Sequence, residues 1–212
     1  MINETTGAYK CPLCGKISRH RIVMGADGSD VYDLDTRPPE TRRSTMFSWV
    51  QECPHCGYVA SKLTDKPPVD AAFLQTPEYV GCGGIEFQSD LAKQFYRLYL
   101  IKTHAGDARN AYWSALEAAW ASDDFLDDQS AVACRKLALA PLEKWIGQDA
   151  NNEHLKAMKI DVLRRAGKFD EAIQYAESLS FSDEFLRKIA DYEVELAKKQ
   201  DAACHKTDEV QK

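Results

Sequence analysis

The sequence predicts an α+β protein in which a small β module precedes a mainly helical domain. Two pairs of cysteines and several β-branched segments fall within residues 1–66. From Gln88 onward, apolar residues instead recur at spacings of three and four, which is the period of an α-helix. The predicted division is a β module at 1–66, a connector at 67–87, a helical domain at 88–202 and a polar tail at 203–212.

Within the β module, β-branched and aromatic residues predict strands over 16–23, 45–52 and 58–60. The segment Gly25–Arg43 is rich in Gly, Asp and Pro, which favours a loop. Pro67-Pro68 is the clearest break in the chain, and we expect at most one or two short helical turns in the connector that follows.

The helical period predicts six helices. Asp107 is the expected cap of the second, Ser182 the expected start of the last, and the tail from Ala203 is expected to be frayed. The predicted ranges are 88–106, 107–120, 126–146, 152–166, 168–179 and 182–201.

Two turns in the helical domain resemble each other. The segments 106–111 and 167–172 both place Gly at a helix end and Ala five residues later. This pattern is typical of the turn inside a tetratricopeptide repeat, where small residues permit close helix packing. The copies are 61 residues apart rather than a multiple of 34. We therefore expect a degenerate, repeat-like array, with a generic helical bundle as the alternative.

Composition limits the class of protein. The net charge of −6 comes mostly from acidic residues after position 66, which weakens proposals of non-specific binding to nucleic acid or anionic membranes. The N-terminus lacks the pattern of a signal peptide, and no apolar run approaches the roughly 20 residues that cross a bilayer. These features predict a cytoplasmic protein that does not bind membranes, in which seven cysteines serve as metal ligands or buried thiols.

The strongest motif is a Cys-Pro-x-Cys-Gly pentapeptide that occurs twice. It predicts a structural metal site with four ligands, since two cysteines three apart in a tight turn reach one ion and two such turns complete a tetrahedron. Proline fixes φ inside the turn, and glycine accepts a positive φ at its end. The ligands are Cys11, Cys14, Cys53 and Cys56.

Zinc is the expected ion, because a closed four-thiolate shell is the usual structural zinc site. Iron is the alternative, since the same double turn holds a single iron in rubredoxins and would make the protein an electron carrier. Two independent dithiols are a further alternative, but the surrounding sequence does not resemble the βαβ setting of a thioredoxin-type motif.

The loop before the second cysteine pair carries alternating acids. They could bind a hard cation or act as an acid–base pair, but no histidine, serine or phosphate-binding loop accompanies them. We favour a structural role in which Arg37 locks the loop beside the β module. The residues are Asp30, Asp33, Asp35 and Arg37.

The remaining candidates have a structural interpretation beside the functional one. Cys82 and Cys134 are expected to be packed thiols, and Trp113 and Trp120, which share a helix face, are expected to lie in the core. His55 is expected to point away from the metal, and His20 to lie at the surface. We expect no catalytic residues.

The first cysteine turn, the segment Asp33–Glu40 and the segment Trp49–Tyr58 together resemble bacterial proteins of the domain of unknown function 2225 family. The resemblance spans nearly the whole chain. It implies a zinc-ribbon-like module joined to tetratricopeptide-like helices, with the four cysteines at the ligand positions. It implies no activity.

The leading hypothesis is therefore a non-enzymatic, zinc-stabilised protein whose helical array binds a protein partner. The alternative is nucleic-acid recognition by the β module, in which arginines and Trp49 would form a basic, aromatic face. The arginines are Arg19, Arg21, Arg42 and Arg43.

Overall fold

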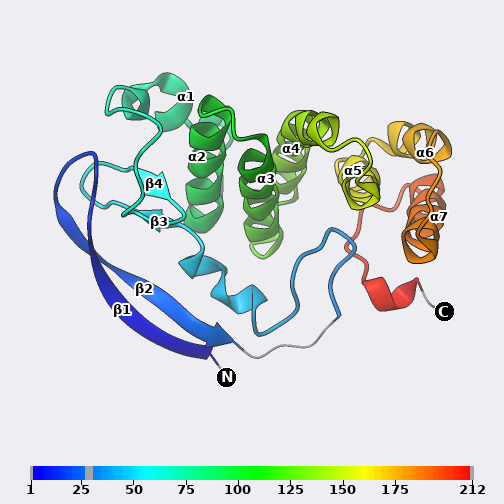
Figure 1. Ribbon diagram of the computed structural model, residues 1–212, viewed down its shortest axis with the longest axis horizontal. Helices are drawn as coiled ribbons and strands as arrows, with labels where there is room; N and C mark the ends of the chain where they lie inside the picture. The colour runs from blue at the N-terminus through cyan, green and yellow to red at the C-terminus, as the bar shows by residue number, and fades with distance from the viewer. Residues whose placement is uncertain (1, 27–30, 211–212) are drawn as a thin grey trace.

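A computed structural model of the chain describes residues 2–26 and 31–210. A long antiparallel hairpin lies at one end of the molecule, and helices α2–α7 follow one another in a row away from it (Figure 1). The fold therefore combines a small antiparallel β module with a larger helical part, as the α+β class predicts. None of the helices in the described ranges is long and apolar enough to cross a lipid bilayer.

The β module contains two separate two-stranded sheets. Strands β1 (Ile2–Lys10) and β2 (Ile17–Ala26) pair in an antiparallel register that is interrupted by one irregularity next to Asn3. Strands β3 (Gln51–Glu52) and β4 (Val59–Ala60) form the second sheet. The strands predicted at 16–23 and 58–60 are confirmed. Strand β1 was not predicted, because its side chains are mostly exposed and show no apolar alternation.

The strand predicted over 45–52 is wrong for most of its length. Residues Arg43–Ser48 form the 3-10 helix η1, and only Gln51–Glu52 pair as strand. The Thr45 hydroxyl donates to the Arg42 carbonyl, and the Ser48 hydroxyl donates to the Thr45 carbonyl. Such local side-chain bonds favour a turn over a strand, although the composition is that of a strand.

The connector forms three short turns, one more than the one or two that were predicted. These are the 3-10 helix η2 (Phe73–Gln75), helix α1 (Pro77–Val80) and the 3-10 helix η3 (Cys82–Gly84). Tyr79 of α1 is buried, and its hydroxyl donates to the Gly57 carbonyl at 2.7 Å. The connector thus covers the second cysteine turn.

The six predicted helices are confirmed to within a few residues. Asp107 caps α3 as expected, whereas Asp183 rather than Ser182 caps α7. The helices are α2 (Asp90–His104), α3 (Ala108–Asp123), α4 (Asp128–Gln148), α5 (Glu153–Arg165), α6 (Phe169–Glu177) and α7 (Glu184–Lys198).

The two similar turns have the same backbone geometry. Gly106 and Gly167 take φ angles of 71° and 75°, a left-handed conformation that glycine adopts without strain. The following Ala111 and Ala172 are buried, 1% and 0% exposed, as close helix packing requires.

The tail was expected to be frayed, and for residues 203–210 this is wrong. The segment returns to the loop that follows β2, where the Leu34 amide donates to the His205 carbonyl at 2.8 Å and the Thr207 amide donates to the Tyr32 carbonyl at 2.9 Å. A final 3-10 helix η4 (Thr207–Glu209) follows. Polar composition predicts exposure, but it does not exclude pairing with another polar loop. Residues 211–212 lie outside the described ranges.

Candidate metal centre

The two cysteine motifs fold into the same backbone turn. In each motif the N–H of the first cysteine, Cys11 or Cys53, donates at 2.8 Å to the carbonyl five residues later. The N–H of the glycine bonds back to the carbonyl of the first cysteine at 2.9 Å in both turns. Gly15 and Gly57 take φ angles of 72° and 74°, which explains why glycine ends each motif. The sequence repeat is therefore also a structural repeat.

The turns bring four sulfur atoms together. The Sγ atoms of Cys11, Cys14, Cys53 and Cys56 all lie within 4.8 Å of one another. The Cys11–Cys56 distance is 3.7 Å and the Cys14–Cys53 distance is 3.6 Å. A tetrahedron with metal–sulfur bonds of about 2.3 Å has edges of about 3.8 Å, so this spacing fits one four-coordinate ion. The distances are far longer than the roughly 2.05 Å of a disulfide.

The thiols of the centre differ in pKa because their surroundings differ. The Lys16 amide donates to the Cys14 sulfur and lowers the pKa of that thiol to about 7. Burial raises the pKa of Cys53, and it raises the pKa of Cys56 to about 12. Because thiolates are the coordinating form, a metal ion at this site competes with protons for the sulfurs.

The second turn is anchored to the helical part through buried groups. Tyr58, directly after the turn, is 2% exposed and belongs to the same apolar core as Phe95 of α2. Glu52, directly before the turn, accepts a hydrogen bond of 2.9 Å from Arg97 of α2. The cysteine centre and the first helix of the array therefore form one packed unit.

The acidic loop was expected to lock beside the β module, but it locks onto the helices instead. Asp35 is 2% exposed and accepts a hydrogen bond of 2.8 Å from the Trp120 indole of α3. It also pairs with Arg165 of α5, and it lies 3.6 Å from Arg135 of α4. We call Asp35, Arg135, Arg165 and Asp123 the Asp35 clamp, because Asp123 bridges the same two arginines at 2.5 and 3.0 Å.

The arginines outweigh burial at Asp35. Burial acts to raise the pKa of this carboxyl, but Arg165 and Arg135 lower it, and the net pKa lies below its ordinary value. Arg37 pairs with Asp124 at the end of α3, and its backbone N–H donates to Asp35. The acidic loop therefore has a structural role, as predicted, but it packs against the helices and not beside the β module. Asp30 lies outside the described residues.

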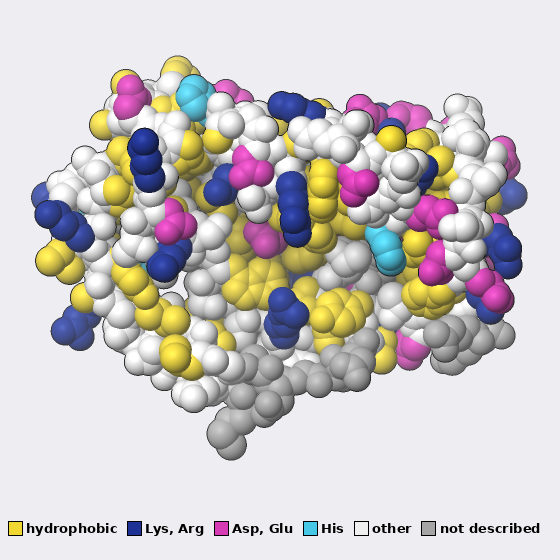
Figure 2. Space-filling model, in the orientation of Figure 1, with side chains coloured by type: hydrophobic (Ala, Val, Ile, Leu, Met, Phe, Trp, Pro, Cys, Tyr) yellow, Lys and Arg dark blue, Asp and Glu magenta, His cyan; other side chains and the backbone are white. Residues whose placement is uncertain are grey.

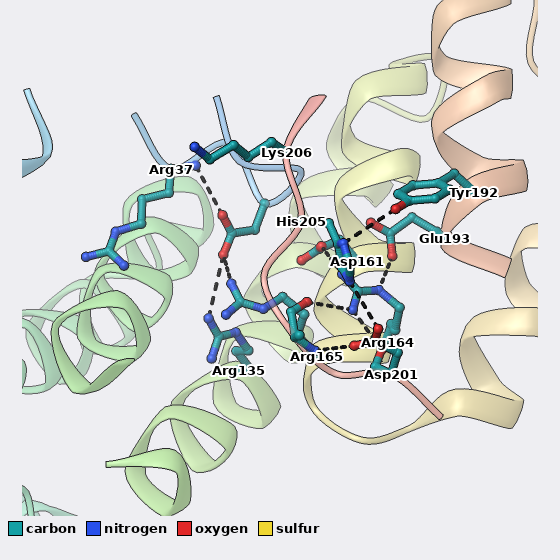
Figure 3. A network of polar contacts seen from close by, with 12 residues as sticks. Arg37, Arg135, Asp161, Arg164, Arg165, Tyr192, Glu193, Asp201, His205 and Lys206 are labelled. Carbon is teal, nitrogen blue, oxygen red and sulfur yellow. Dashed lines mark hydrogen bonds and ion pairs between the residues drawn. The ribbon is translucent and has the colours of Figure 1, made fainter. Parts of the chain in front are cut away.

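A second buried cluster fastens the C-terminal segment. Arg164 of α5 pairs with Glu193 of α7 and with Asp161, and it donates to the carbonyls of Asp201 and Ala203 at 2.8 and 2.9 Å. Figure 3 shows this cluster beside the arginines of the Asp35 clamp. Adjacent arginines at the end of α5 thus hold two different segments.

The other predicted residues have structural positions. Cys82 and Cys134 are buried, 4% and 0% exposed, as expected. Burial raises the pKa of Cys134 to about 12, so this thiol is inert at neutral pH. Trp120 lies in the core as expected, whereas Trp113 is half-buried. His20, on strand β2, accepts or donates a 2.8 Å hydrogen bond with Ser18.

Two of the four arginines in the nucleic-acid alternative already have partners. Arg21 pairs with Glu4 at 2.8 Å and lies over the Phe47 ring at 3.8 Å. Arg43 pairs with Asp124 at 3.2 Å. The proposed basic face is therefore partly neutralised within the chain itself.

In comparisons with known proteins, no family model, curated protein or solved structure matches the chain. The fold and the site define the class of protein: a four-cysteine β module, compatible with zinc binding, joined to an array of helices. Four sulfurs that converge in this way can bind one metal ion.

Proposed function

We propose that this chain is a non-enzymatic interaction protein in which one structural Zn(II) ion holds the β module and the helical array binds a protein partner. The observation that carries the first half is the approach of four cysteine sulfurs to within 4.8 Å of one another. Four thiolates complete the tetrahedral shell that zinc prefers, and such a shell has no open position for substrate or water. The ion would therefore stabilise structure.

The second half is supported by the arrangement of the helices. Two helix pairs, α2–α3 and α5–α6, are joined by turns of matching geometry at Gly106 and Gly167. Repeated helix pairs that stack side by side create extended surfaces that are used for binding proteins. We interpret the array as tetratricopeptide-like on this basis, and we assign the chain to the domain of unknown function 2225 family on the motifs that it shares.

The ion would also act on the array, because the second cysteine turn contacts its first helix. The Glu52–Arg97 bond and the buried Tyr79 connect the turn to α2 and α1. Loss of metal would loosen these contacts and expose apolar surface at that end of the array. Zinc would thus keep the binding surface in one conformation.

Iron is the second candidate ion, because thiolate geometry alone does not separate iron from zinc. A single iron in this shell would make the protein an electron carrier. Iron(III) in four thiolates absorbs visible light, so the purified protein would be red and would bleach on reduction. A colourless protein with one zinc per chain rules out this version.

The test combines metal analysis with partner capture. The full chain, purified without chelator, should contain one zinc per chain and should recover a stoichiometric protein partner from a native lysate. The Cys53→Ser variant should lose both, whereas Cys204→Ser, at an exposed cysteine, should lose neither. Repeated recovery of the metal-loaded protein alone would contradict the interaction role.

A further inference from the structure

The buried acidic side chains of the described residues are each matched by an arginine. Glu117 of α3 departs from this pattern. It is half-buried, and no hydrogen bond or ion pair within the described ranges involves it. The matched pairs are Asp33 with Arg43, Asp35 with Arg165, and both Asp161 and Glu193 with Arg164.

In the middle of α3, Glu117 is one of only two residues whose side chains are partly exposed to solvent. Between residues 111 and 122, Trp113 and Glu117 are half-buried and every other residue is buried. Their spacing of four residues places them on one face of the helix, and Trp120 follows less than one turn after Glu117. The rings of Trp113 and Trp120 have centroids 6.5 Å apart. Glu117 therefore lies on the same face of α3 as Trp113, about one turn after Trp113 and just under one turn before Trp120.

Aromatic rings extend this face of α3 across to α4. Trp145 is half-buried, and its ring centroid lies 6.3 Å from that of Trp113 at an angle of 64°. Arg109 already lies over the Trp145 ring at 5.4 Å, so a ring face at this place accepts a cation. Figure 2 shows a hollow near the middle of the molecule in which hydrophobic side chains lie beside acidic and basic ones.

The surroundings of Glu117 lack a compensating charge. Burial raises the pKa of its carboxyl to about 8, and no neighbouring charged group contributes to the shift. An uncompensated carboxyl in an apolar setting destabilises a fold unless it is neutralised. A partly open, unmatched acid of this kind is typical of a binding site rather than of a structural one.

We propose that Glu117, with Trp113 and Trp145, forms the site that receives a lysine side chain of the protein partner. The proposal rests on the interaction role proposed above and gives the partner's contact its chemistry. The carboxylate would pair with the ammonium group, and the indole faces would contact the alkyl stem and share the positive charge.

Lysine carries a compact ammonium group on a flexible stem, which can reach one oxygen of a partly enclosed carboxylate. Arginine instead pairs with both oxygens of one carboxylate in a planar arrangement, as Arg135 does with Asp123. The half-buried position of Glu117 therefore favours lysine.

The first test uses a small probe and the zinc-loaded full chain. Nα-acetyl-lysine methylamide is titrated while the four tryptophan indole N–H signals are followed by NMR, with the norleucine derivative as the uncharged comparison. We expect saturable binding of the lysine probe that shifts the Trp113 signal, and no saturation with norleucine. Equal responses to both probes would overturn the proposal.

The second test uses matched variants. Glu117→Gln should weaken binding of the lysine probe by about tenfold, a difference of about 1.4 kcal/mol, while Glu177→Gln, at an exposed position, should leave it unchanged. Glu117→Gln should also raise the melting temperature, because it removes an unmatched carboxyl. A variant that binds normally, or that melts at a lower temperature, would contradict the assignment.

These outcomes separate the site from the wider function. If a partner is recovered equally well by the wild type and by Glu117→Gln, the lysine site is wrong and the interaction role stands. If the lysine probe binds at Trp113 but no partner protein is found, the site stands and the interaction role is wrong.

Discussion

The cysteine centre and the Asp35 clamp both hold distant parts of the chain together, but by different means. The cysteine centre joins two turns of the β module through four sulfurs and depends on an ion from solution. The Asp35 clamp joins the acidic loop to three helices with charges that the chain itself supplies. The difference predicts two sensitivities: the β module should respond to metal supply, and the contact between loop and helices should respond to acid.

The cysteine centre and the Asp35 clamp both fix the segment that lies between the two cysteine pairs. One end of this segment leads into the second cysteine turn, and its middle is fixed by Asp35. A loop of this length would otherwise be free to move, so two anchors make it part of the fold. Breaking each anchor separately should therefore give separable effects.

The largest effect is expected at the metal ligands. Cys53→Ser removes one thiolate of the proposed shell, and structural zinc contributes on the order of 10 kcal/mol to the stability of small zinc domains. We expect loss of bound zinc and fast hydrogen exchange throughout β3 and β4, measured by elemental analysis and mass spectrometry. Cys134→Ala, at a buried cysteine outside the centre, should keep the zinc. Retention of zinc by Cys53→Ser would contradict the assignment.

The next largest effect is expected in the Asp35 clamp. Arg165→Met leaves Asp35 buried with weaker compensation, and breaking a buried ion pair typically costs about 3 kcal/mol or more. Denaturant unfolding should show this loss while the zinc content stays the same. Arg187→Met, at an exposed arginine of α7, should change stability by less than about 0.5 kcal/mol. Zinc loss in Arg165→Met would show that the cysteine centre depends on the Asp35 clamp.

A smaller effect is expected from acid. The pKa of Asp35 lies below its ordinary value of 3.8, so the unfolded chain takes up the proton first as the pH falls. The stability that Asp35 contributes is thus complete at neutral pH and is lost below about pH 4. The unfolding free energy of the wild type should fall more steeply between pH 5 and 3 than that of Asp35→Asn.

Acid also protonates the cysteine ligands, and this part of the loss should be the same in both proteins. Asp65→Asn, at an exposed position, should follow the wild-type curve. Parallel curves for the wild type and Asp35→Asn would mean that Asp35 is not ionised in the fold.

The smallest effect is expected on the outer hairpin. Arg21→Ala removes an exposed ion pair with Glu4 and the contact with Phe47, which together are worth about 0.5 to 1 kcal/mol. Arg19→Ala, also on β2 and exposed, should be neutral. Thermal unfolding of both variants measures the difference. A loss above 2 kcal/mol would show that the hairpin contributes more to the fold than its exposure indicates.

The cysteine centre could be predicted from the sequence because its information is local. Each turn consists of five consecutive residues, and the pattern is repeated. The helices were predictable for the same reason, since their period and caps lie within short windows. The 3-10 helix at Arg43–Ser48 was missed because Thr45 and Ser48 bond to nearby carbonyls, which strand propensity does not describe.

The Asp35 clamp could not be predicted, because its members are brought together only by the tertiary fold. Asp35 and Arg165 are 130 positions apart, and nothing near either residue identifies the other. The ordered tail was missed for a similar reason: its bonds to Tyr32 and Leu34 join residues that lie far apart in the sequence. One sequence shows which residues are polar, but only the fold shows which of them meet.

Four cysteines that share one ion in a closed shell give a specific X-ray absorption spectrum at the metal edge. For the purified full chain, we expect one zinc per chain with four sulfur neighbours at about 2.3 Å. A protein without metal, or a shell that contains nitrogen or oxygen ligands, would contradict this expectation.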